Sequence, residues 1–453
     1  MCFSKMASPH FFYLLCFLSI ITFTSSTSDT IVVPLSPLFT KHPSSDPFHT
    51  LKLIASASLN RAHHLKHHKS HLNSSSSFVK TQVHPKSYGG YSINLNFGTP
   101  PQTFPFVLDT GSSLVWLPCS SHYLCSKCNT FPTKIPTFIP KNSSSSKFIG
   151  CKNPKCTWLF GPNVQSHCQD SQTCPAYTIQ YGLGSTSGFL LSENLNFPGK
   201  IVPDFLVGCS IMSIYQPAGI AGFGRGPESV PSQMGLKRFS YCLVSHRFDD
   251  SPESSDLVLN GGKTNGVSYT PFQKNPSSEN PAFSTYYYLT LRKILVGEKR
   301  VRIPSRSLKP DSVNGNGGSI VDSGSTFTFM ERPVFDLVAQ EFEKQVNYTR
   351  ARHVEEQSGL SPCFNVHGME TASFPELTFQ FRGGAKMTLP QTNYFSLLGK
   401  SDVACLTIVT DDVVGSAFAV GPAIILGNYQ QQNYYVEYDL ENQKFGFRSQ
   451  NCK

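Results

Sequence analysis

The segment FVLDTGSS at residues 106–113 returns in altered form as SIVDSGST at residues 319–326. In both copies apolar residues lead into an aspartate, and a hydroxyl residue, a glycine and a second hydroxyl residue follow it. The glycine permits a tight turn, and the hydroxyls can hold the carboxylate in one orientation. One such turn is ordinary, but two copies indicate a functional pair. The residues concerned are Asp109, Thr110, Gly111, Ser112, Asp322, Ser323, Gly324 and Ser325.

A second pair of motifs repeats in step with the first. Ile-Ala-Gly at 220–222 and Ile-Leu-Gly at 425–427 follow their own aspartates at similar distances, and a strand-type stretch precedes each aspartate motif. Such a repeat indicates one β-rich unit used twice. We predict two lobes, at residues 88–265 and 266–453, related by a pseudo-twofold axis that brings the two aspartates face to face.

Two facing carboxyls predict a specific chemistry. Asp109 and Asp322 could not both ionise cheaply in one site, so one pKa would rise and the other would fall, and the pair would share a proton under acidic conditions. The ionised member can take a proton from water while the protonated member polarises a carbonyl. This chemistry hydrolyses an amide with water as the nucleophile, and we expect neither a metal nor another cofactor.

Composition favours a β-rich protein with sizeable cores. Hydrophobic residues make up 39% of the 453 residues, but charged residues only 15%, against about 25% in a typical soluble domain. A long charged coiled coil is therefore excluded. Short β-type stretches separated by Gly, Pro, Asn and Ser continue to the end of the chain. The one convincing helical stretch is at about 332–346, with Pro333 at its start.

The N-terminal region indicates secretion. Residues 1–27 combine Lys5, an apolar run at 11–23 and small residues, which is the pattern of a removable signal peptide. A membrane anchor is the alternative, but the run is short for a span, and we expect no anchor. Three Asn-x-Ser/Thr sites agree with secretion and predict glycosylation; they are Asn73, Asn142 and Asn347.

Residues 28–87 differ from the rest of the chain. They hold most of its excess positive charge, with seven Lys or Arg against two Asp, and are rich in His. The remainder carries little net charge, which argues against nucleic-acid binding. We predict a propeptide that lies outside the core, and hypothesise that its Lys and His cations lie near the two aspartates at neutral pH and separate from them on acidification. A merely solubilising tail and a His-rich metal site are the alternatives.

The cysteines predict a disulfide framework. Fourteen Cys occur, and the twelve beyond the signal peptide predict six disulfides in an oxidising compartment. Seven of them lie between residues 119 and 174, so at least one must pair outside that segment. The spacing Cys125-x-x-Cys128 leaves zinc binding as an alternative.

From about residue 88 to its end, the chain resembles the pepsin-type aspartic endopeptidases, most closely the secreted plant nepenthesin-like branch. The resemblance rests on DTGSS, DSGST, the two hydrophobic-hydrophobic-Gly motifs, the Cys-rich insert and ILGNYQQQNYYVEYDLENQKFGF at 425–447. It implies an all-β, bilobal pepsin-like fold with the active-site cleft between the lobes. It makes Asp109 and Asp322 the catalytic pair. Ser112 and Ser325 match the accompanying hydroxyls, whereas Thr110 and Ser323 match hydroxyls that lock the two loops together.

The resemblance also implies a flap, a β-hairpin that covers the cleft. Tyr181 and Gly182 match its tip, Trp116 matches the tryptophan that hydrogen-bonds the flap tyrosine, and Ile220 would line the primary pocket. A lid of this kind excludes water and strengthens electrostatic interactions. The alternative is that these side chains are ordinary core residues. Leu183 stands where plant relatives often have Asp, which leaves the preference of that subsite open.

We therefore predict a secreted, monomeric aspartic endopeptidase that hydrolyses proteins or peptides at acidic pH. We expect it in the apoplast or cell wall, with the vacuole as the second choice. The alternative is an inactive pepsin-fold protein that binds and inhibits a partner, because plant xylanase inhibitors resemble this chain in fold and cysteine density. Such inhibitors lack a complete pair of motifs, whereas both are present here. A lectin-like or structural β-protein would leave the aspartate repeat unexplained.

Overall fold

The computed structural model describes residues 31–37, 47–67, 90–128, 135–169, 172–182, 184–216, 218–245, 254–277, 280–369, 372–397, 402–411 and 421–452. The predicted signal peptide, the glycosylation site at Asn73 and the flap residue Leu183 lie outside these residues.

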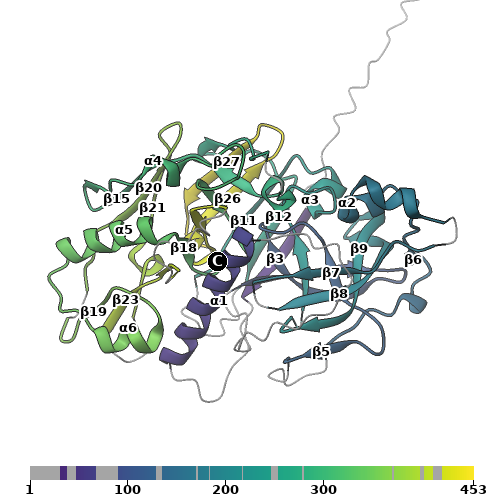
Figure 1. The fold of residues 1–453 in the computed structure, drawn as a ribbon, viewed down its shortest axis with the longest axis horizontal. Coiled ribbons are helices and arrows are strands. Elements are labelled where there is room, and N and C mark those ends of the chain that lie inside the picture. Colours follow the sequence, from purple (N-terminus) through teal and green to yellow (C-terminus); the bar gives the residue numbers. More distant parts are fainter. Residues whose placement is uncertain are drawn as a thin grey trace, which may run out of the picture.

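One large sheet forms the centre of the molecule (Figure 1). Within the described residues it has 15 strands. Thirteen follow one path: β13 (Ser268–Pro271), β27 (Lys444–Ser449), β26 (Tyr434–Asp439), β11 (Arg238–Cys242), β12 (Ser255–Leu259), β1 (Ile31–Pro37), β2 (Tyr91–Phe97), β3 (Gln102–Asp109), β10 (Gly219–Gly222), β4 (Trp116–Pro118), β9 (Lys200–Ile214), β8 (Ser185–Phe197) and β6 (Lys147–Phe148). In addition, β5 (Leu124–Ser126) pairs with β9, and β7 (Tyr177–Gln180) pairs with β8. Because strands from both sides of residue 265 take part, the two halves share this sheet.

Three smaller sheets complete the C-terminal half. The first contains β14 (Tyr287–Leu289), β17 (Ser319–Val321), β25 (Ile424–Leu426), β18 (Thr328–Met330) and β24 (Ile408–Val409). The second contains β16 (Lys299–Arg300), β15 (Leu291–Val296), β20 (Leu377–Phe381) and β21 (Lys386–Thr388). The third contains β19 (Cys363–Asn365), β23 (Val403–Leu406) and β22 (Phe395–Leu397).

The sequence repeat is also a structural repeat. β10 runs parallel to β3 and places Gly222 beside Asp109, and β25 runs parallel to β17 and places Leu426 beside Val321. Each of these second strands also pairs antiparallel with the strand that follows its aspartate loop, β4 in one half and β18 in the other. Both aspartates therefore lie at the end of a buried strand, held between two neighbours.

The longest described helix, α1 (Pro47–His67), was not predicted. The predicted helix is present as α5 (Arg332–Gln345), but the prediction that it would be the only convincing one is wrong. α1 lies between the two halves of the molecule, as the dark purple ribbon in Figure 1 shows. The shorter helices are α2 (Cys156–Phe160), α3 (Val230–Met234), α4 (Ser305–Leu308) and α6 (Arg352–Ser358). Short 3-10 turns are η1 (Pro140–Asn142), η2 (Pro162–His167), η3 (Pro281–Ser284), η4 (Gln391–Asn393) and η5 (Tyr429–Gln431).

The described parts of residues 28–87 belong to the folded body, so the prediction that this segment lies outside the core is wrong. β1 pairs with both β12 and β2 in the large sheet. In α1, Leu51, Ile54 and Leu65 are buried against side chains of the C-terminal half. The apolar positions recur at helical spacing, which is the signal that could have predicted α1, but the surrounding His and Lys residues hide it.

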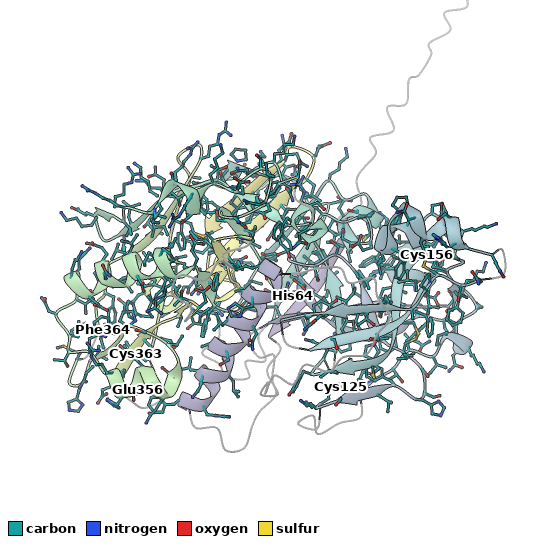
Figure 2. All side chains as sticks on the ribbon, in the orientation of Figure 1. His64, Cys125, Cys156, Glu356, Cys363 and Phe364 are labelled. Atoms are coloured by element: carbon teal, nitrogen blue, oxygen red, sulfur yellow. A yellow bond between two sulfur atoms is a disulfide. The ribbon has the colours of Figure 1, made fainter. Side chains whose placement is uncertain are left out.

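The described residues contain six disulfides, as predicted. They are Cys119–Cys209, Cys125–Cys128, Cys151–Cys168, Cys156–Cys174, Cys242–Cys452 and Cys363–Cys405. The first of these leaves the Cys-rich segment, as the odd count required. Because Cys125 pairs with Cys128, the alternative of a zinc site there is wrong. Figure 2 shows Cys125 and Cys156 in one half of the molecule and Cys363 at the opposite end, with His64 between them.

Two further predictions concern glycosylation and membrane anchoring. Asn142 and Asn347 are both exposed, so each is accessible for the glycosylation that the sequence predicts. Of the helices within the described residues, none combines the length and the apolar character needed to cross a membrane.

Candidate active site

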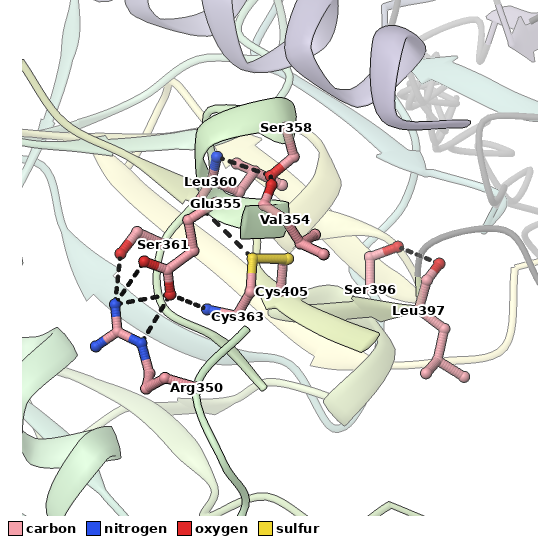
Figure 3. The surroundings of a disulfide bond; sticks show 10 residues. All are labelled: Arg350, Val354, Glu355, Ser358, Leu360, Ser361, Cys363, Ser396, Leu397 and Cys405. Carbon is pink, nitrogen blue, oxygen red and sulfur yellow. Dashed lines mark hydrogen bonds and ion pairs between the residues drawn. A yellow bond between two sulfur atoms is a disulfide. The ribbon is translucent and has the colours of Figure 1, made fainter. Parts of the chain in front are cut away.

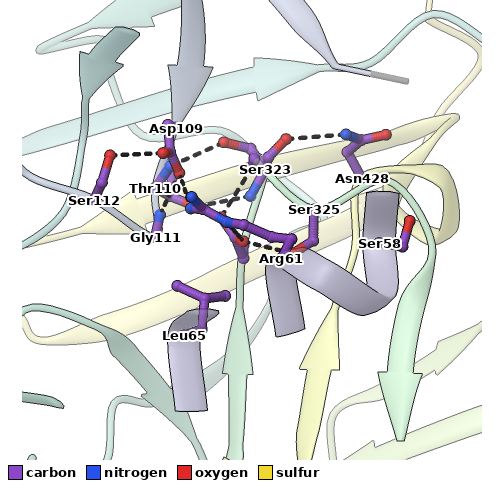
Figure 4. Close-up of polar contacts among 12 residues, drawn as sticks. Ser58, Arg61, Leu65, Asp109, Thr110, Gly111, Ser112, Ser323, Ser325 and Asn428 are labelled. Carbon is purple, nitrogen blue, oxygen red and sulfur yellow. Dashed lines mark hydrogen bonds and ion pairs between the residues drawn. The ribbon is translucent and has the colours of Figure 1, made fainter. Parts of the chain in front are cut away.

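The two aspartate loops contact each other, with Thr110 of one loop beside Ser323 of the other (Figure 4). Ser112 Oγ donates to Asp109 Oδ2 at 2.6 Å, and the Gly111 amide donates to Asp109 Oδ1 at 2.9 Å. The other loop repeats this pattern, since Ser325 Oγ and the Gly324 amide donate to the two oxygens of Asp322 at 2.7 and 2.9 Å. Both carboxyls are thus held in matched orientations, and both are buried, with 1% and 0% of Asp109 and Asp322 exposed.

The two glycines allow the loops to approach each other. A Cβ atom on Gly111 would lie 2.6 Å from Asp322 Oδ1, and one on Gly324 would lie 2.4 Å from Asp109 Oδ1. Neither distance is possible for a real side chain, so each glycine is needed because the opposite aspartate lies against it. This cross-packing brings the two carboxyls into one site.

Thr110 and Ser323 tie the loops together, as the resemblance implied. The Ser323 amide donates to Thr110 Oγ1 at 2.9 Å, and the Thr110 amide donates to Ser323 Oγ at 3.1 Å. Ser323 Oγ in turn donates to the Leu108 carbonyl at 2.8 Å. Asn428, which the sequence analysis did not single out, adds a further bond by donating to the Ser323 carbonyl at 2.9 Å.

The predicted flap is the hairpin of β7 and β8, and its tyrosine is anchored. Trp116 Nε1 donates to the Tyr181 hydroxyl at 2.8 Å. Both side chains are buried in one apolar cluster, which also includes Ile220. Gly182, at the tip, lies so close to α1 that a Cβ there would be 2.3 Å from Arg61 Cα. The flap therefore closes on the helix.

Arg61 of α1 contacts both aspartates, and Figure 4 shows it beside Asp109. Its Nη2 is 2.6 Å from Asp109 Oδ1, and its Nε is 3.1 Å from Asp322 Oδ2. The hypothesis that Lys and His cations of this segment occupy the site is therefore corrected, because the contacting group is a guanidinium. Its planar, forked donors suit two carboxylates better than an ammonium does. An Arg on the apolar face of a helix is the signal that could have predicted this contact.

The site differentiates the two carboxyls. Burial raises the pKa of Asp109 to about 6, an effect that Arg61 opposes and the Asp322 charge increases. Burial also acts against ionisation of Asp322, but Arg61, the Ser325 hydroxyl and the Gly324 amide together bring its pKa below the ordinary value. One guanidinium balances one carboxylate, so the buried group of three is neutral when Asp109 is protonated.

Further contacts dock α1 in the cleft. Ser58 Oγ accepts a hydrogen bond from the Phe327 amide at 2.9 Å, and the Tyr286 hydroxyl donates to the Leu65 carbonyl at 3.1 Å. Lys66 is 1% exposed, and its Nζ lies 4.8 Å from the centroid of the Phe329 ring. The ring of His64 lies 6.1 Å from that of Tyr181. α1 thus contacts the C-terminal half and the flap together.

α6 packs against α1 and is itself firmly held (Figure 3). Arg350 donates from Nε and Nη2 to the two carboxylate oxygens of Glu355, each at 2.7 Å. Glu355 Oε1 also accepts from the Cys363 amide at 2.8 Å, next to the Cys363–Cys405 disulfide. This ion pair and disulfide give α1 a rigid docking surface.

The site offers acid and base groups but no metal ligand set. Within the described residues, no group of three or more His, Cys, Asp or Glu could hold a metal ion. The available chemistry is proton transfer by two carboxyls beneath a flap, at a site that α1 covers in this structure.

Comparisons with known proteins agree with this geometry. Family models described as "Xylanase inhibitor N-terminal" and "Xylanase inhibitor C-terminal" match residues 91–260 and 286–449. The chain is 35% identical over 390 residues to the aspartic proteinase nepenthesin-2 of Nepenthes gracilis, covering 83% of this chain and 81% of that one. It is 33% identical over 416 residues to a probable aspartyl protease of Arabidopsis thaliana, with coverage of 80% and 82%.

Solved structures agree on the fold. The crystal structure of EDGP has 18% sequence identity and a TM-score of 0.64, covering 93% of this chain and 95% of that one. Basic 7S globulin from soybean has 15% identity and a TM-score of 0.60, with coverage of 94% and 98%. These similarities confirm the predicted all-β, bilobal fold, and at such low identity they extend to the fold alone.

Proposed function

This chain belongs to the plant pepsin-like aspartic proteases, and we propose that it is the inactive precursor of a secreted aspartic endopeptidase that hydrolyses peptide bonds at acidic pH. The observation that carries the proposal is the paired arrangement of Asp109 and Asp322, each with its own serine and glycine donors, at one buried site. A protein that only bound a partner would not need two matched carboxyls.

Once α1 leaves, the pair can act as acid and base. The two carboxyls titrate as one unit. In the working enzyme the ionised member takes a proton from water, and the protonated member hydrogen-bonds the carbonyl of the scissile amide. The flap, held by the bond from Trp116 to Tyr181, covers the substrate and excludes bulk water, which strengthens these interactions.

Residues 28–87 act as the propeptide in this proposal. Arg61 forms ion pairs with both carboxylates, and the flap tip lies against the helix backbone. No substrate can therefore reach Asp109 and Asp322 while α1 is docked. Activation therefore requires removal of α1. The six disulfides suit an oxidising compartment, and we propose the apoplast or cell wall, with the vacuole as the second choice.

The decisive test is proteolysis by the secreted, acid-processed protein. We expect cleavage of denatured casein at acidic pH that pepstatin inhibits and that both Asp109→Asn and Asp322→Asn abolish. Asp256→Asn, at an exposed position on β12, is the matched control and should retain activity. Pepstatin-insensitive cleavage that survives both dyad variants would contradict the proposal.

The second candidate is a protein-binding inhibitor of this fold. One observation favours it, namely that the matching family models carry the description of xylanase inhibitors. If the correctly processed, disulfide-bonded protein cleaves nothing across the acidic range, this candidate replaces the first. Inhibition of a xylanase by the same preparation would then be the measurement to make.

A further inference from the structure

Four buried polar side chains form a chain of contacts beside the aspartate loops. The Tyr241 hydroxyl donates to Gln431 Oε1 at 2.6 Å and lies 3.1 Å from the Tyr438 hydroxyl, which in turn lies 3.5 Å from Thr110 Oγ1. The two tyrosines are 1% and 0% exposed, and Gln431 and Thr110 are both 0% exposed. We call this chain, from Gln431 through Tyr241 and Tyr438 to Thr110, the tyrosine relay.

Both ends of the relay reach the main chain around Asp322. At one end, Gln431 Nε2 donates to the Leu426 carbonyl at 3.0 Å, and the same carbonyl accepts the Asp322 amide at 3.0 Å. At the other end, Thr110 Oγ1 accepts the Ser323 amide at 2.9 Å. The relay therefore links the groups that fix two consecutive amides, those of Asp322 and Ser323.

The relay also joins the two halves of the chain. Tyr241 lies on β11 and Tyr438 on β26, strands that pair antiparallel in the shared sheet. The Tyr438 ring also stacks on that of Phe239, with 4.4 Å between centroids. A phenylalanine would keep this stacking, so a change from Tyr to Phe removes the hydroxyl contacts and little else.

We propose that Tyr241 and Tyr438 are positioning residues of the proteolytic reaction, which hold the Asp322 loop against the Thr110 loop through their hydroxyls. This inference rests on the proposed function. Burial raises the pKa of both phenols above the ordinary value, so they remain hydrogen-bond donors throughout the acidic and neutral range. Without the hydroxyls, packing would persist, but the two loops would lose a polar connection that sets their relative position.

The test compares Tyr241→Phe, Tyr438→Phe and the double variant in the acid-processed enzyme. Each single variant should lower kcat about tenfold and leave KM within about twofold, because misplacement of reacting groups affects the transition state most. The kcat of the double variant should be about that of either single variant, because both substitutions break the same relay. Tyr394→Phe is the matched control, since its buried hydroxyl donates to the Pro375 carbonyl outside the relay.

The control separates positioning from ordinary packing. If the relay variants keep the kcat of Tyr394→Phe, or if their losses multiply in the double variant, the inference is overturned. If the wild-type enzyme and Tyr394→Phe are both inactive, the proposed function fails instead. Amide hydrogen exchange then decides on the relay itself, since both relay variants should expose the Asp322 and Ser323 amides to faster exchange than Tyr394→Phe does. Unchanged exchange would overturn the relay even in an inactive protein.

Discussion

At the residue scale, the identity of the cation between the carboxyls determines how the precursor responds to pH. A guanidinium keeps its charge at every relevant pH, whereas a His side chain, which the composition also suggested, would itself titrate near neutral pH. The acid response of the site must therefore come from the carboxyls that Arg61 contacts. The affinity of α1 for the site therefore depends, through the Arg61 ion pairs, on the protonation of Asp109 and Asp322. We call these two ion pairs the Arg61 lock.

Replacing Arg61 should open this lock. In Arg61→Met the stem is retained but two buried carboxyls lose their counter-charge, and breaking a buried pair in this way costs roughly 3–5 kcal/mol. We expect the variant precursor to convert to the shorter, active form at a higher pH and faster than the wild type, as followed by gel electrophoresis and peptide cleavage. Lys52→Met, at an exposed position on the same helix, is the control. Equal conversion rates for the wild type and Arg61→Met would refute the lock.

The two carboxyls should leave opposite signatures in the pH dependence of precursor stability. The pKa of Asp109 is raised to about 6, so the stability it contributes is full below about pH 4 and is lost as the pH rises through about 6. The pKa of Asp322 is lowered, so its contribution is present above about pH 4 and is lost as the pH falls further.

Asparagine variants of the precursor test these signs, because Asn mimics a protonated Asp. Asp109→Asn should gain melting temperature relative to the wild type as the pH rises from about 4 to about 6. Asp322→Asn should be less stable than the wild type at neutral pH and approach it only below about pH 4. Differential scanning fluorimetry between about pH 3 and 7 measures both. Identical pH dependences for the two variants would contradict the assignment.

At the element scale, α1 combines a good apolar fit with one costly group. Leu51, Ile54 and Leu65 are buried, but Lys66 is buried as well and its Nζ has no hydrogen-bond partner among the described residues. Burial lowers the pKa of Lys66, and the charges of Glu331 and Asp411 offset this only in part. A buried ammonium without a hydrogen-bond partner makes docking of the helix less favourable, so α1 can be released more easily than a helix whose buried polar groups are all hydrogen-bonded.

Lys66→Met should therefore strengthen docking. Methionine keeps most of the apolar stem without the charge, and removal of an unpaired buried charge stabilises the docked state. Because the pKa of Lys66 is lowered from 10.5, the wild type loses stability only as the pH falls from there to the lowered pKa, and below it the advantage of the variant should be full and constant. We expect a higher melting temperature and slower acid conversion than in Lys52→Met. A less stable Lys66→Met precursor would mean that the contact with the Phe329 ring outweighs desolvation.

At the scale of the whole molecule, the N-terminal segment is built into the fold at two places. β1 lies between β12 and β2 in the large sheet, and α1 packs its apolar face on the C-terminal half and its Arg61 on the two aspartates. Cutting the chain after α1 therefore leaves many non-covalent contacts intact. Covalent cleavage and release are separate steps in this arrangement.

An engineered protease site within residues 68–89 separates the two steps. After cleavage at neutral pH, the N-terminal fragment should stay bound through gel filtration and the protein should remain inactive. Only below about pH 4 should the fragment dissociate and activity appear, because Asp322, whose pKa is lowered, then takes up its proton and its bond to Arg61 weakens. The same cut in Arg61→Met should release the fragment already at neutral pH, as gel filtration would show. Loss of the fragment from the cut wild-type protein at neutral pH would show that non-covalent contacts do not retain α1.

Local pattern was sufficient to predict much of this protein. The repeated Asp-hydroxyl-Gly-hydroxyl motifs predicted two equivalent loops, because a strand, a tight turn and local hydrogen bonds are encoded by neighbouring residues. The count and spacing of cysteines likewise predicted six disulfides, and Pro333 with the apolar face behind it predicted α5. The roles of Tyr181, Trp116 and Ile220 came from family resemblance and remain predictions, although the structure places them in one cluster.

The tertiary structure decided what depends on residues far apart in the chain. That Arg61 contacts Asp109 and Asp322, and that Tyr241 and Tyr438 share a polar chain, follows from docking and strand pairing, which no local pattern specifies. The same holds for α1, whose basic, His-rich sequence is typical of an exposed segment, and for β1, whose partners β2 and β12 lie far along the chain. The sequence by itself determined the paired aspartate loops, the β-rich class and the disulfide number. Only the fold decided which cation those aspartates meet, because burial and charge balance arise when distant surfaces close on each other.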